Sequence, residues 1–410
     1  AEIIQKAVEG EISDNIPTTY LQNHKNTTLI LDNEAASELT RIKSPWLVNN
    51  LDWNNKNRFK AIAWLCKKTK KSILKLTDED YNQNGMSDLL AQYGSSYDLN
   101  IEMFNRLQHT ITGWPGGKPN ADDSNRPERK EPSKKRVIIF SPHPDDDVIS
   151  MGGTFDRLVS QGHEVHVAYQ TSGNIAVSDK DALKFIEVNS DIMGADQTKT
   201  ARDLEIAVQS INTQKPAPRS ICDLKASIRK HESLAATRYI GIPDSQVHFM
   251  NLSFYETGTI KKNPFSKKDV NETISLIESI KPHQIYAAGD LSDPHGTHRV
   301  CLNIIFESLK LLKPKKFMND CWVWLYRGAW HEWDIHEIEM AVPMSPDQVL
   351  RKRKAIFYHQ SQKDGVMFKG DDHREFWVRA EERNSNTAKD YKSLGLADYA
   401  AMEAFKRYFY

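Results

Sequence analysis

The sequence predicts an α/β fold with a mostly parallel sheet and helices on both faces, preceded by a small, mainly helical N-terminal region. Three observations support this prediction. Short apolar runs alternate with helical patterns after residue 135, as they do in βαβ units. A segment rich in Pro, Gly and charged residues separates that alternation from the beginning of the chain. With 410 residues, the chain is long enough for more than one domain.

The beginning of the chain is expected to contain two parts and a linker. Residues 1–43 combine helical patterns with one short apolar run, Leu29–Leu31, which suits a strand. Residues 44–112 contain several Trp residues among charged turns and no chemical motif, so we expect a small helical unit with an aromatic core. Residues 113–135 have the composition of a linker.

Residues 136–410 contain the alternating pattern, with a helical extension expected at the C-terminus. The expected strands cover Val137–Phe140, Glu164–Tyr169, Gln246–Met250, Gln284–Ala288 and Cys321–Tyr326. The expected helices cover Gly152–Ser160, Lys180–Ser190, Ile228–Ile240, Lys268–Ile280, His298–Leu311 and a segment from Pro346 to Gln362. Ser345 before Pro346 is a good start for the last of these helices.

The first expected strand ends in a run of chemically active residues, His143-Pro-Asp145-Asp146-Asp147, and a Gly pair follows. Polar residues at the carboxyl end of such a strand lie where open α/β sheets form ligand crevices. An imidazole and a carboxylate on one turn suit a metal such as zinc, and a further carboxylate remains as a base. The alternative is an acidic turn that caps the next helix, but this explains neither the His nor three successive Asp. We expect only Asp147 to cap the helix that Val148 begins.

A second strand end, after Gln284–Ala288, is followed by His295 and His298. Their spacing puts both imidazoles on one side of a helical turn. A lone His is more often a surface or core residue, but two at this spacing after a strand end favour a site. Three protein ligands with one open position for water is the arrangement of a catalytic zinc. Such an ion supplies what amide hydrolysis needs, an activated water and a polarised carbonyl.

Taken in order, these motifs resemble those of the PIG-L-like (LmbE-like) family of zinc-dependent N-acetylglucosaminyl deacetylases, over about residues 134–362. That family has a His-Pro-Asp-Asp motif followed by Glu or Asp, and a late His-x-x-His. Its Arg-x-x-Glu at the head of a helix is matched by Arg229–Glu232, and its Thr-x-Gly loop by Thr171–Gly173. The resemblance implies a Rossmann-like fold. The chain departs from the family at Gly296–Thr297, where Pro-Asp is usual, so a carboxylate is missing there.

The resemblance also implies residue roles. The ligands of zinc, or of another divalent metal, are expected to be His143, Asp146 and His298. Asp145 is similar to the general base, and His295 to the imidazole that polarises the carbonyl or protonates the leaving amine. Arg229 would help to hold the base or the substrate.

The candidate substrate-binding residues are Thr171, Gly173, Asn174 and Arg374. Arg374 lies in a charged and aromatic tail where Arg379 and Arg383 also stand. An Arg in this tail could close over an anionic substrate, because its guanidinium suits phosphate. The alternative for the tail is a salt-bridged helix face.

Residues 1–43 separately resemble the C-terminal tail of glucosamine-6-phosphate deaminases, in which a Leu-Gln-x-His turn precedes the last strand and helix. Leu21–His24 matches that turn, followed by Thr28–Asp32 and Glu34–Leu39. The alternative is an ordinary helix-strand-helix segment. The active-site residues of the deaminases lie upstream of this tail and have no counterpart here, so we do not expect deamination by that route.

The sequence therefore predicts a cytoplasmic, zinc-dependent hydrolase that removes an acetyl or other small acyl group from a free or phosphorylated amino sugar. Lys+Arg and Asp+Glu both number 55 and mean hydropathy is −0.61, so we expect neither nucleic acid nor membrane as a partner. Four scattered cysteines favour a reducing compartment, and a homo-oligomer is allowed. The alternative is a sugar-phosphate-binding or regulatory module of a longer glucosamine-6-phosphate deaminase-like protein. The intact motif residues argue against it.

Deleting residues 1–43 should leave deacetylase activity per folded molecule unchanged, because this segment contributes no residue to the expected zinc site. An apolar strand without its sheet seeks another edge, so the deletion should act on solubility or oligomeric state instead. Acetate release per zinc-loaded molecule, together with size-exclusion chromatography, tests both expectations. A large loss of activity with zinc retained would show that this segment shapes the substrate pocket.

Overall fold

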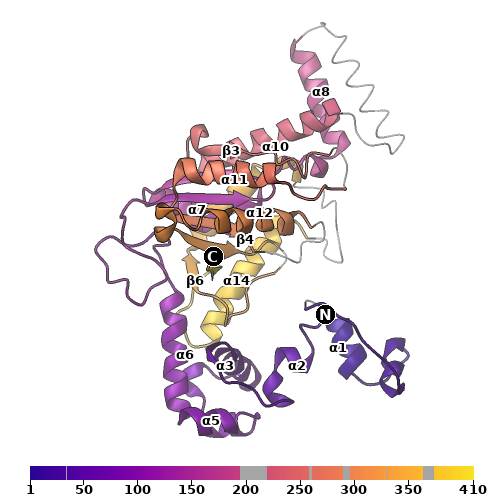
Figure 1. Ribbon diagram of the computed structural model, residues 1–410, viewed down its shortest axis with the longest axis vertical. Helices are drawn as coiled ribbons and strands as arrows, with labels where there is room; N and C mark the ends of the chain where they lie inside the picture. The colour runs from indigo at the N-terminus through magenta and orange to yellow at the C-terminus, as the bar shows by residue number, and fades with distance from the viewer. Residues whose placement is uncertain (34, 194–218, 258–260, 290–295, 330, 363–373) are drawn as a thin grey trace. The chain divides into compact units, whose positions relative to one another are not determined.

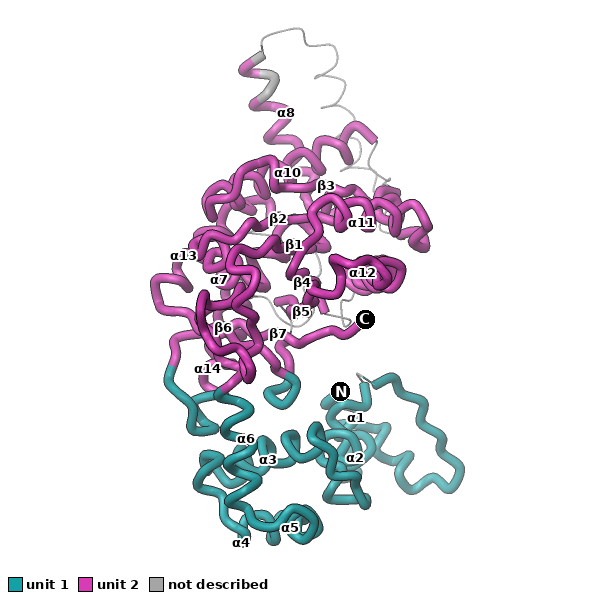
Figure 2. Tube along the Cα trace, turned by 60° about the vertical axis from the view of Figure 1, so that its left-hand side comes forward, with its two compact units in different colours: residues 1–108, 334–337, 390–398 teal, residues 109–333, 338–389, 399–410 magenta. Residues whose placement is uncertain are grey.

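The described part of the chain forms two compact units (Figure 2). The computed structural model describes residues 1–410 apart from 34, 194–218, 258–260, 290–295, 330 and 363–373. The first unit comprises residues 1–108, 334–337 and 390–398, and the second comprises 109–333, 338–389 and 399–410. Each unit has its own interior.

The first unit is helical. Trp46 and Trp53 are buried in it, as the sequence predicts, and the indole N–H of Trp53 donates to Asp88 (2.8 Å). Thr77 and Asp80 form a reciprocal capping box at the start of α4. The helices that begin in this unit are α1 Glu2–Glu9, α2 Thr40–Lys43, α3 Asn55–Thr69, α4 Asp78–Asn82, α5 Ser87–Tyr93 and α6 Ser96–Thr110.

The predicted strand at Leu29–Leu31 is wrong, because these residues form neither a strand nor a bridge. Half of the Leu29 surface and 89% of that of Ile30 are exposed. A strand needs a neighbour to pair its backbone groups, and the sequence offers no other strand in residues 1–43. The local apolar run alone therefore does not produce the element.

The second unit is built on a seven-stranded sheet with the order β3-β2-β1-β4-β5-β7-β6 among the described residues. The five strands from β3 to β5 in that order are parallel, whereas β7 is antiparallel to both β5 and β6. The mostly parallel sheet predicted from the sequence is confirmed. The strands are β1 Arg136–Ser141, β2 Glu164–Tyr169, β3 Val247–Phe249, β4 Gln284–Ala288, β5 Trp322–Tyr326, β6 Met340–Met344 and β7 Ala401–Tyr408.

Helices cover both faces of this sheet (Figure 1). Val137 and Ile139 of β1 join a core cluster with α7, α10 and α13, while Ile138 and Phe140, buried and outside that cluster, point to the opposite face. Helices α11 and α12 pack together and belong to this opposite face. The helices are α7 Asp146–Ser160, α8 Asp179–Met193, α10 Arg219–Ile240, α11 Lys267–Ile280, α12 Thr297–Leu312, α13 Pro346–Phe357 and α14 Phe376–Ser393.

The C-terminal part differs from the sequence prediction in two respects. Helix α13 ends at Phe357, and the residues up to Gln362 form a turn and the 3₁₀ helix η7 Gln360–Gln362. The tail contains helix α14 but finishes in strand β7, which joins the sheet between β5 and β6. The pairing partner of β7 lies far away in sequence, so a local pattern does not reveal it.

The segment 113–135 contains no helix or strand, but it is not a detached linker. Glu128 is buried and accepts a hydrogen bond from the Thr112 hydroxyl (2.8 Å). The carbonyl of Pro115 accepts one from the side-chain amide of Gln284 in β4 (2.8 Å). These contacts fasten the segment to the second unit.

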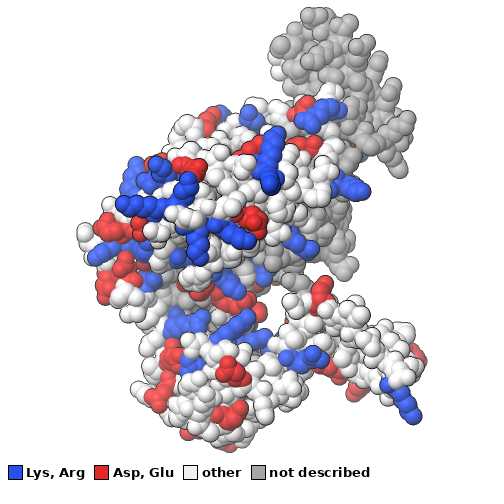
Figure 3. All heavy atoms as spheres, viewed as in Figure 1, with Lys and Arg blue, Asp and Glu red and all other residues white. Residues whose placement is uncertain are grey.

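Acidic and basic side chains are interspersed on the face shown in Figure 3. Among the described residues, no helix is long and apolar enough to cross a bilayer.

Candidate metal centre

The carboxyl end of β1 forms a tight turn before α7. The backbone N–H of His143 donates to Oδ2 of Asp146 (2.9 Å), and the N–H of Asp145 donates to the carbonyl of His143 (2.9 Å). Asp145 has a φ of 155°, which is uncommon for a residue with a side chain. Backbone outliers of this kind often occur at functional sites.

Three potential ligand atoms converge at this turn. Nδ1 of His143 lies 3.2 Å from Oδ2 of Asp146, and Nε2 of His298 lies 3.1 Å from the same oxygen. The two imidazole nitrogens are 3.3 Å apart. His298 comes from the first turn of α12, which follows β4, the strand next to β1. The structure thus brings His298 of the second motif next to the first motif.

The spacing of these atoms fits a small divalent ion. Zinc binds imidazole nitrogen and carboxylate oxygen at about 2.0–2.2 Å, so tetrahedral ligands lie about 3.3–3.5 Å from one another. The three observed separations are 3.1–3.3 Å. Burial opposes ionisation of Asp146, but His298 and His143 hold its pKa below the ordinary value, so the carboxylate is charged. Two imidazoles and one carboxylate are a donor set that zinc accepts.

Asp145 lies beside this group and is paired with Arg229. Nη2 of Arg229 is 3.2 Å from Oδ1 of Asp145 and donates to the carbonyl of Pro144 (2.6 Å). Burial raises the pKa of Asp145 and Arg229 opposes the rise, with a net shift upward. Arg229 is itself buried and lies in the middle of α10, not at the head of a helix as predicted. The pair provides a second carboxylate that is not one of the three ligand atoms.

Asp147 does not cap α7, so the predicted capping role is wrong. The helix begins at Asp146, two residues before the predicted start at Val148, and the side chain of Asp147 points into the core with no exposed surface. Its two oxygens accept hydrogen bonds from the hydroxyls of Ser141 (3.2 Å) and Tyr169 (3.0 Å). Burial raises the pKa of Asp147 to about 7.

The loop after β2 closes over the same turn. The hydroxyl of Thr171 donates to the carbonyl of Pro142 (2.7 Å). Gly173 has a φ of 63°, and a Cβ placed there would lie 2.9 Å from Cδ of Pro144 and 3.1 Å from Nε of Arg229. The loop therefore approaches the Asp145–Arg229 pair more closely than a side chain would permit. Asn174 follows, buried, at the start of the 3₁₀ helix η4 Asn174–Ala176.

The two remaining predicted site residues stand differently: only Arg374 is described, and its ion pair lies outside this arrangement. His295 lies outside the described residues. Arg374 is about half exposed and forms an ion pair with Glu382 of α14. Arg383 lies deeper in the structure, where it donates to the main chain, for example to the carbonyl of Ser150 (2.9 Å).

His359 is a residue of the site to which the sequence analysis assigned no role. It lies between α13 and η7, is buried, and neither ring nitrogen has a hydrogen-bond partner among the described residues. Burial, reinforced by the positive charge of Arg229, lowers its pKa to about 3, so the imidazole is neutral. Together with Asp145 and Gln362 it lines a cavity of about 20 Å³, which is room for a single water. The feature of the sequence that could have indicated this residue is the run His359-Gln-Ser-Gln362.

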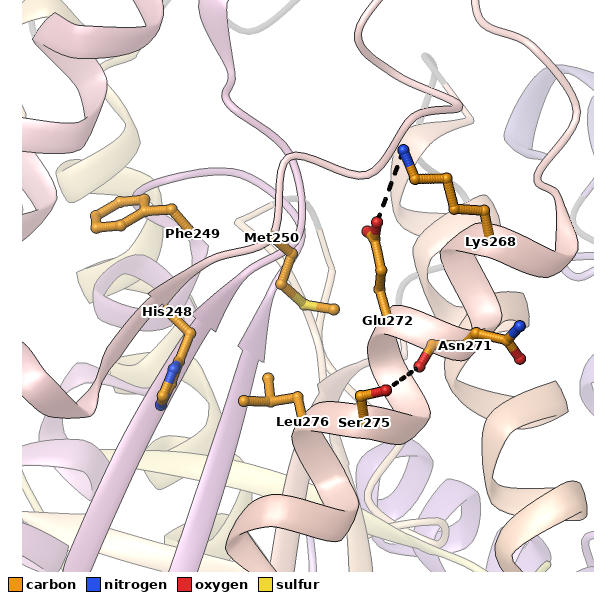
Figure 4. A pocket seen from close by; sticks show the side chains of 8 residues that line it. All are labelled: His248, Phe249, Met250, Lys268, Asn271, Glu272, Ser275 and Leu276. Atoms are coloured by element: carbon orange, nitrogen blue, oxygen red, sulfur yellow. Dashed lines mark hydrogen bonds and ion pairs between the residues drawn. The ribbon is translucent and has the colours of Figure 1, made fainter.

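A larger groove elsewhere in the unit shares no residue with this centre. It has a volume of about 580 Å³ and lies between β3 and α11 (Figure 4). Its charged residues, Lys268 and Glu272, form an ion pair with each other (3.9 Å). The candidate active site is therefore identified by its potential metal ligands and not by the volume of a pocket.

A second cluster of possible ligands, Asp334, His336 and Glu337, belongs to the first unit. Burial lowers the pKa of His336 to about 4; Asp334 and Glu337 oppose this shift, whereas Lys60 and Lys56 add to it. Two cations thus already act on this cluster, which disfavours a further cation. The group around Asp146 is the better candidate.

Comparisons with known proteins extend these observations. The family model of GlcNAc-PI de-N-acetylase, PIG-L, matches residues 138–309. A glucosamine-6-phosphate deaminase-like protein of Bacteroides thetaiotaomicron is 53% identical over 420 residues, which cover all of this chain and 63% of that protein. The chain thus spans less than two thirds of this relative. A glucosamine-6-phosphate deaminase of Streptococcus suis is 49% identical over 39 residues, 10% of this chain and 17% of that protein.

Among solved structures, the N,N'-diacetylchitobiose deacetylase of Pyrococcus horikoshii is 19% identical with a TM-score of 0.45, covering 67% of this chain and 84% of that protein. A likeness of this size does not bear on activity. The deaminase-like relative supports the second resemblance noted for the beginning of the sequence.

Replacing Gly173 with Ala should destabilise the second unit more than the same change at Gly162. Both glycines have positive φ, 63° and 82°, so both variants incur left-handed backbone strain of about 1–2 kcal/mol. Only at Gly173 does the new Cβ also meet Pro144 and Arg229, which should add about 1–3 kcal/mol. Urea unfolding of both variants measures the difference. Equal losses would contradict the close approach described here.

Proposed function

We propose, from the premise that residues 138–309 form a domain of the PIG-L family, that this chain is a metal-dependent hydrolase that removes an acetyl or other small acyl group from the nitrogen of an amino sugar. The observation that supports this most strongly is the convergence of His143, Asp146 and His298 beside an additional buried carboxylate. A ligand group and a separate base are the two components that metal-assisted amide hydrolysis requires.

In this proposal, His143, Asp146 and His298 hold zinc or another divalent ion. When bound, such an ion lowers the pKa of a water molecule towards about 7 and polarises a carbonyl. Asp146 is the central residue of the three, because one of its oxygens faces both imidazoles. His298 is buried and His143 partly exposed, so the open side of the group lies towards His143.

Asp145 accepts the proton of the attacking water. Its raised pKa makes it a stronger proton acceptor than an ordinary carboxylate. Arg229 keeps the carboxylate in place through its ion pair and its hydrogen bond to Pro144. Water then adds to the amide carbon, the C–N bond breaks, and the nitrogen must leave with a proton.

The leaving nitrogen needs a proton donor. The resemblance assigns it to His295, which lies outside the described residues, so this role rests on the sequence. His359 is a neutral imidazole in the cavity next to Asp145 and has hydrogen-bonding capacity to offer a substrate. We assign it to substrate binding, along with Thr171, Gly173 and Asn174 of the loop after β2, and Arg374.

The amino-sugar substrate is supported by the family description and by the deaminase-like relative. That relative extends well beyond the part that this chain covers, so the alternative is that deaminase activity resides in another part of a longer protein. Ammonia release from glucosamine 6-phosphate by this chain alone would indicate that deamination resides here instead.

Three substitutions should separate ligand from base. Asp145→Asn keeps the size of the side chain but cannot accept a proton, so zinc should stay bound while kcat falls by about 10²–10⁴-fold. Asp146→Asn and His298→Ala should lose most of the zinc, because only weakened or incomplete coordination remains. His166→Ala, which changes a histidine of β2 outside the three-ligand group, is the matched control and should keep zinc and activity. Metal content and acetate release are the measurements. Full zinc occupancy in His298→Ala would contradict the ligand assignment.

A panel of N-acetylated sugars should identify the substrate class. The zinc-loaded chain is expected to release acetate from at least one N-acetylated amino sugar, and Asp145→Asn should release none above background. Comparing each sugar with its phosphorylated form tests whether a phosphate is recognised. Arg374→Gln should raise KM for the phosphorylated form only, because the guanidinium is suited to phosphate. No acetate release from any member of the panel would refute the proposed reaction.

A further inference from the structure

Helix α7 is broken soon after it begins. Met151 has φ −140° and ψ 27°, whereas the residues on either side are helical. The first segment, Asp146–Ser150, contains the candidate ligand Asp146, and the second segment starts at Gly152. A break leaves carbonyl groups at the end of one segment and N–H groups at the start of the next without partners inside the helix.

Buried charges of opposite sign face the two sides of this break. Glu403 of β7 accepts hydrogen bonds from the N–H of Gly153 (3.0 Å) and from the N–H and hydroxyl of Thr154 (both 2.6 Å). Arg383 of α14 donates to the carbonyl of Ser150 (2.9 Å). A carboxylate at the start of a helix and a cation at its end are the favourable signs for the helix dipole.

Lys352 of α13 keeps Glu403 charged. Its Nζ lies 2.7 Å from Oε1 of Glu403 and donates to Oδ1 of Asn384 (2.8 Å). Burial opposes the charge on Glu403, but Lys352 and the donors of α7 outweigh it, and the pKa of Glu403 lies below its ordinary value. Both charged side chains are only 1% exposed, so neither is satisfied by solvent.

The glycine pair after Met151 makes this approach possible. A Cβ on Gly153 would lie 2.1 Å from Sδ of Met344 and 3.4 Å from Oε1 of Glu403. A Cβ on Gly152 would lie 3.0 Å from Cγ of Lys352. The side chains that reach the break from α13, β6 and β7 therefore occupy the space that any larger residue would need.

We propose that Glu403 and Arg383 are positioning residues of the metal centre, which fix the break in α7 and thereby the placement of Asp145 and Asp146. This inference rests on the proposed function. The first segment of α7 is a single short turn, so its direction is set by what holds its two ends. One end is the turn at His143, and the other is the break. Arg383 and Glu403 act through Asp145 and Asp146 and do not themselves touch a reacting atom.

The test compares zinc affinity with stability in variants of the full chain. Glu403→Gln keeps the shape but removes the charge that faces Gly153 and Thr154, and leaves Lys352 without its counterion. It should weaken zinc binding by about tenfold or more, in the range seen when residues that orient metal ligands are changed. It should also destabilise the protein, because a buried charge loses its partner. Competition with a chelator gives the zinc affinity, and thermal unfolding of the metal-free chain gives the stability.

The double variant Lys352→Met, Glu403→Gln separates positioning from mere stabilisation. Removing both buried charges should restore much of the stability. The break in α7 still lacks its carboxylate, so zinc affinity and kcat should stay at least about tenfold below wild type. Arg383→Met should also weaken zinc binding, because the carbonyl of Ser150 loses its donor.

Glu381→Gln is the matched control. It removes a carboxylate that pairs with Arg353 (2.6 Å) between the same helices, α13 and α14, without touching α7. Its zinc affinity and kcat should equal those of wild type. Wild-type zinc affinity and kcat in the double variant would overturn the positioning role while leaving the proposed function intact. Absence of zinc binding by the wild-type chain would refute the proposed function, and this inference with it.

Discussion

Three consecutive carboxyl groups, Asp145 to Asp147, are buried at the end of β1. The residues around them are arranged to stabilise these three groups. Adjacent like charges in a medium of low dielectric repel strongly, so each group needs its own compensation. Asp146 faces two imidazoles, and Asp145 faces Arg229. Asp147 has no cation beside it in the described structure; it receives two hydroxyl hydrogen bonds, and its pKa rises to about 7. Because each carboxyl group has different neighbours, the three groups differ in pKa.

The neighbouring segments are shaped by the same requirement. Arg229 reaches Asp145 from α10 only because the loop at Gly173 has no side chain in the way. His298 reaches Asp146 because β4 pairs directly with β1, and the helix after β4 starts at the same edge of the sheet. The polar turn after β1 thus restricts the residues that can occupy the contact positions in α10, in the loop at Gly173 and in the helix after β4. A metal ion in the group of His143, Asp146 and His298 would provide the remaining positive charge.

Much of this arrangement could be predicted from the sequence, for identifiable reasons. The five parallel strands are short apolar runs bounded by polar turns, and buried parallel strands have that local signature. Strand ends meet at one edge, so the motifs after Val137–Phe140 and Gln284–Ala288 could be expected to converge. The role of Asp147 could not be predicted, because capping is a local preference and the hydroxyl of Tyr169 comes from another strand. The strand predicted at Leu29–Leu31 is wrong for the opposite reason: its local pattern suits a strand, but no segment among the described residues pairs with it.

Three residues whose structural roles were not predicted from the sequence lie beyond the family match. The family match ends at residue 309, whereas His359, Arg383 and Glu403 lie beyond it. A parallel sheet that ended at β5 would leave an open edge, and β7 covers that edge in the antiparallel direction. The same strand brings Glu403 to the break in α7, about 250 residues away in sequence. Strand β7 therefore both covers the edge of the sheet and holds the turn that carries Asp145 to Asp147. It follows that β7 belongs to the same compact unit as the metal centre, although it contributes no residue to the group of possible ligands.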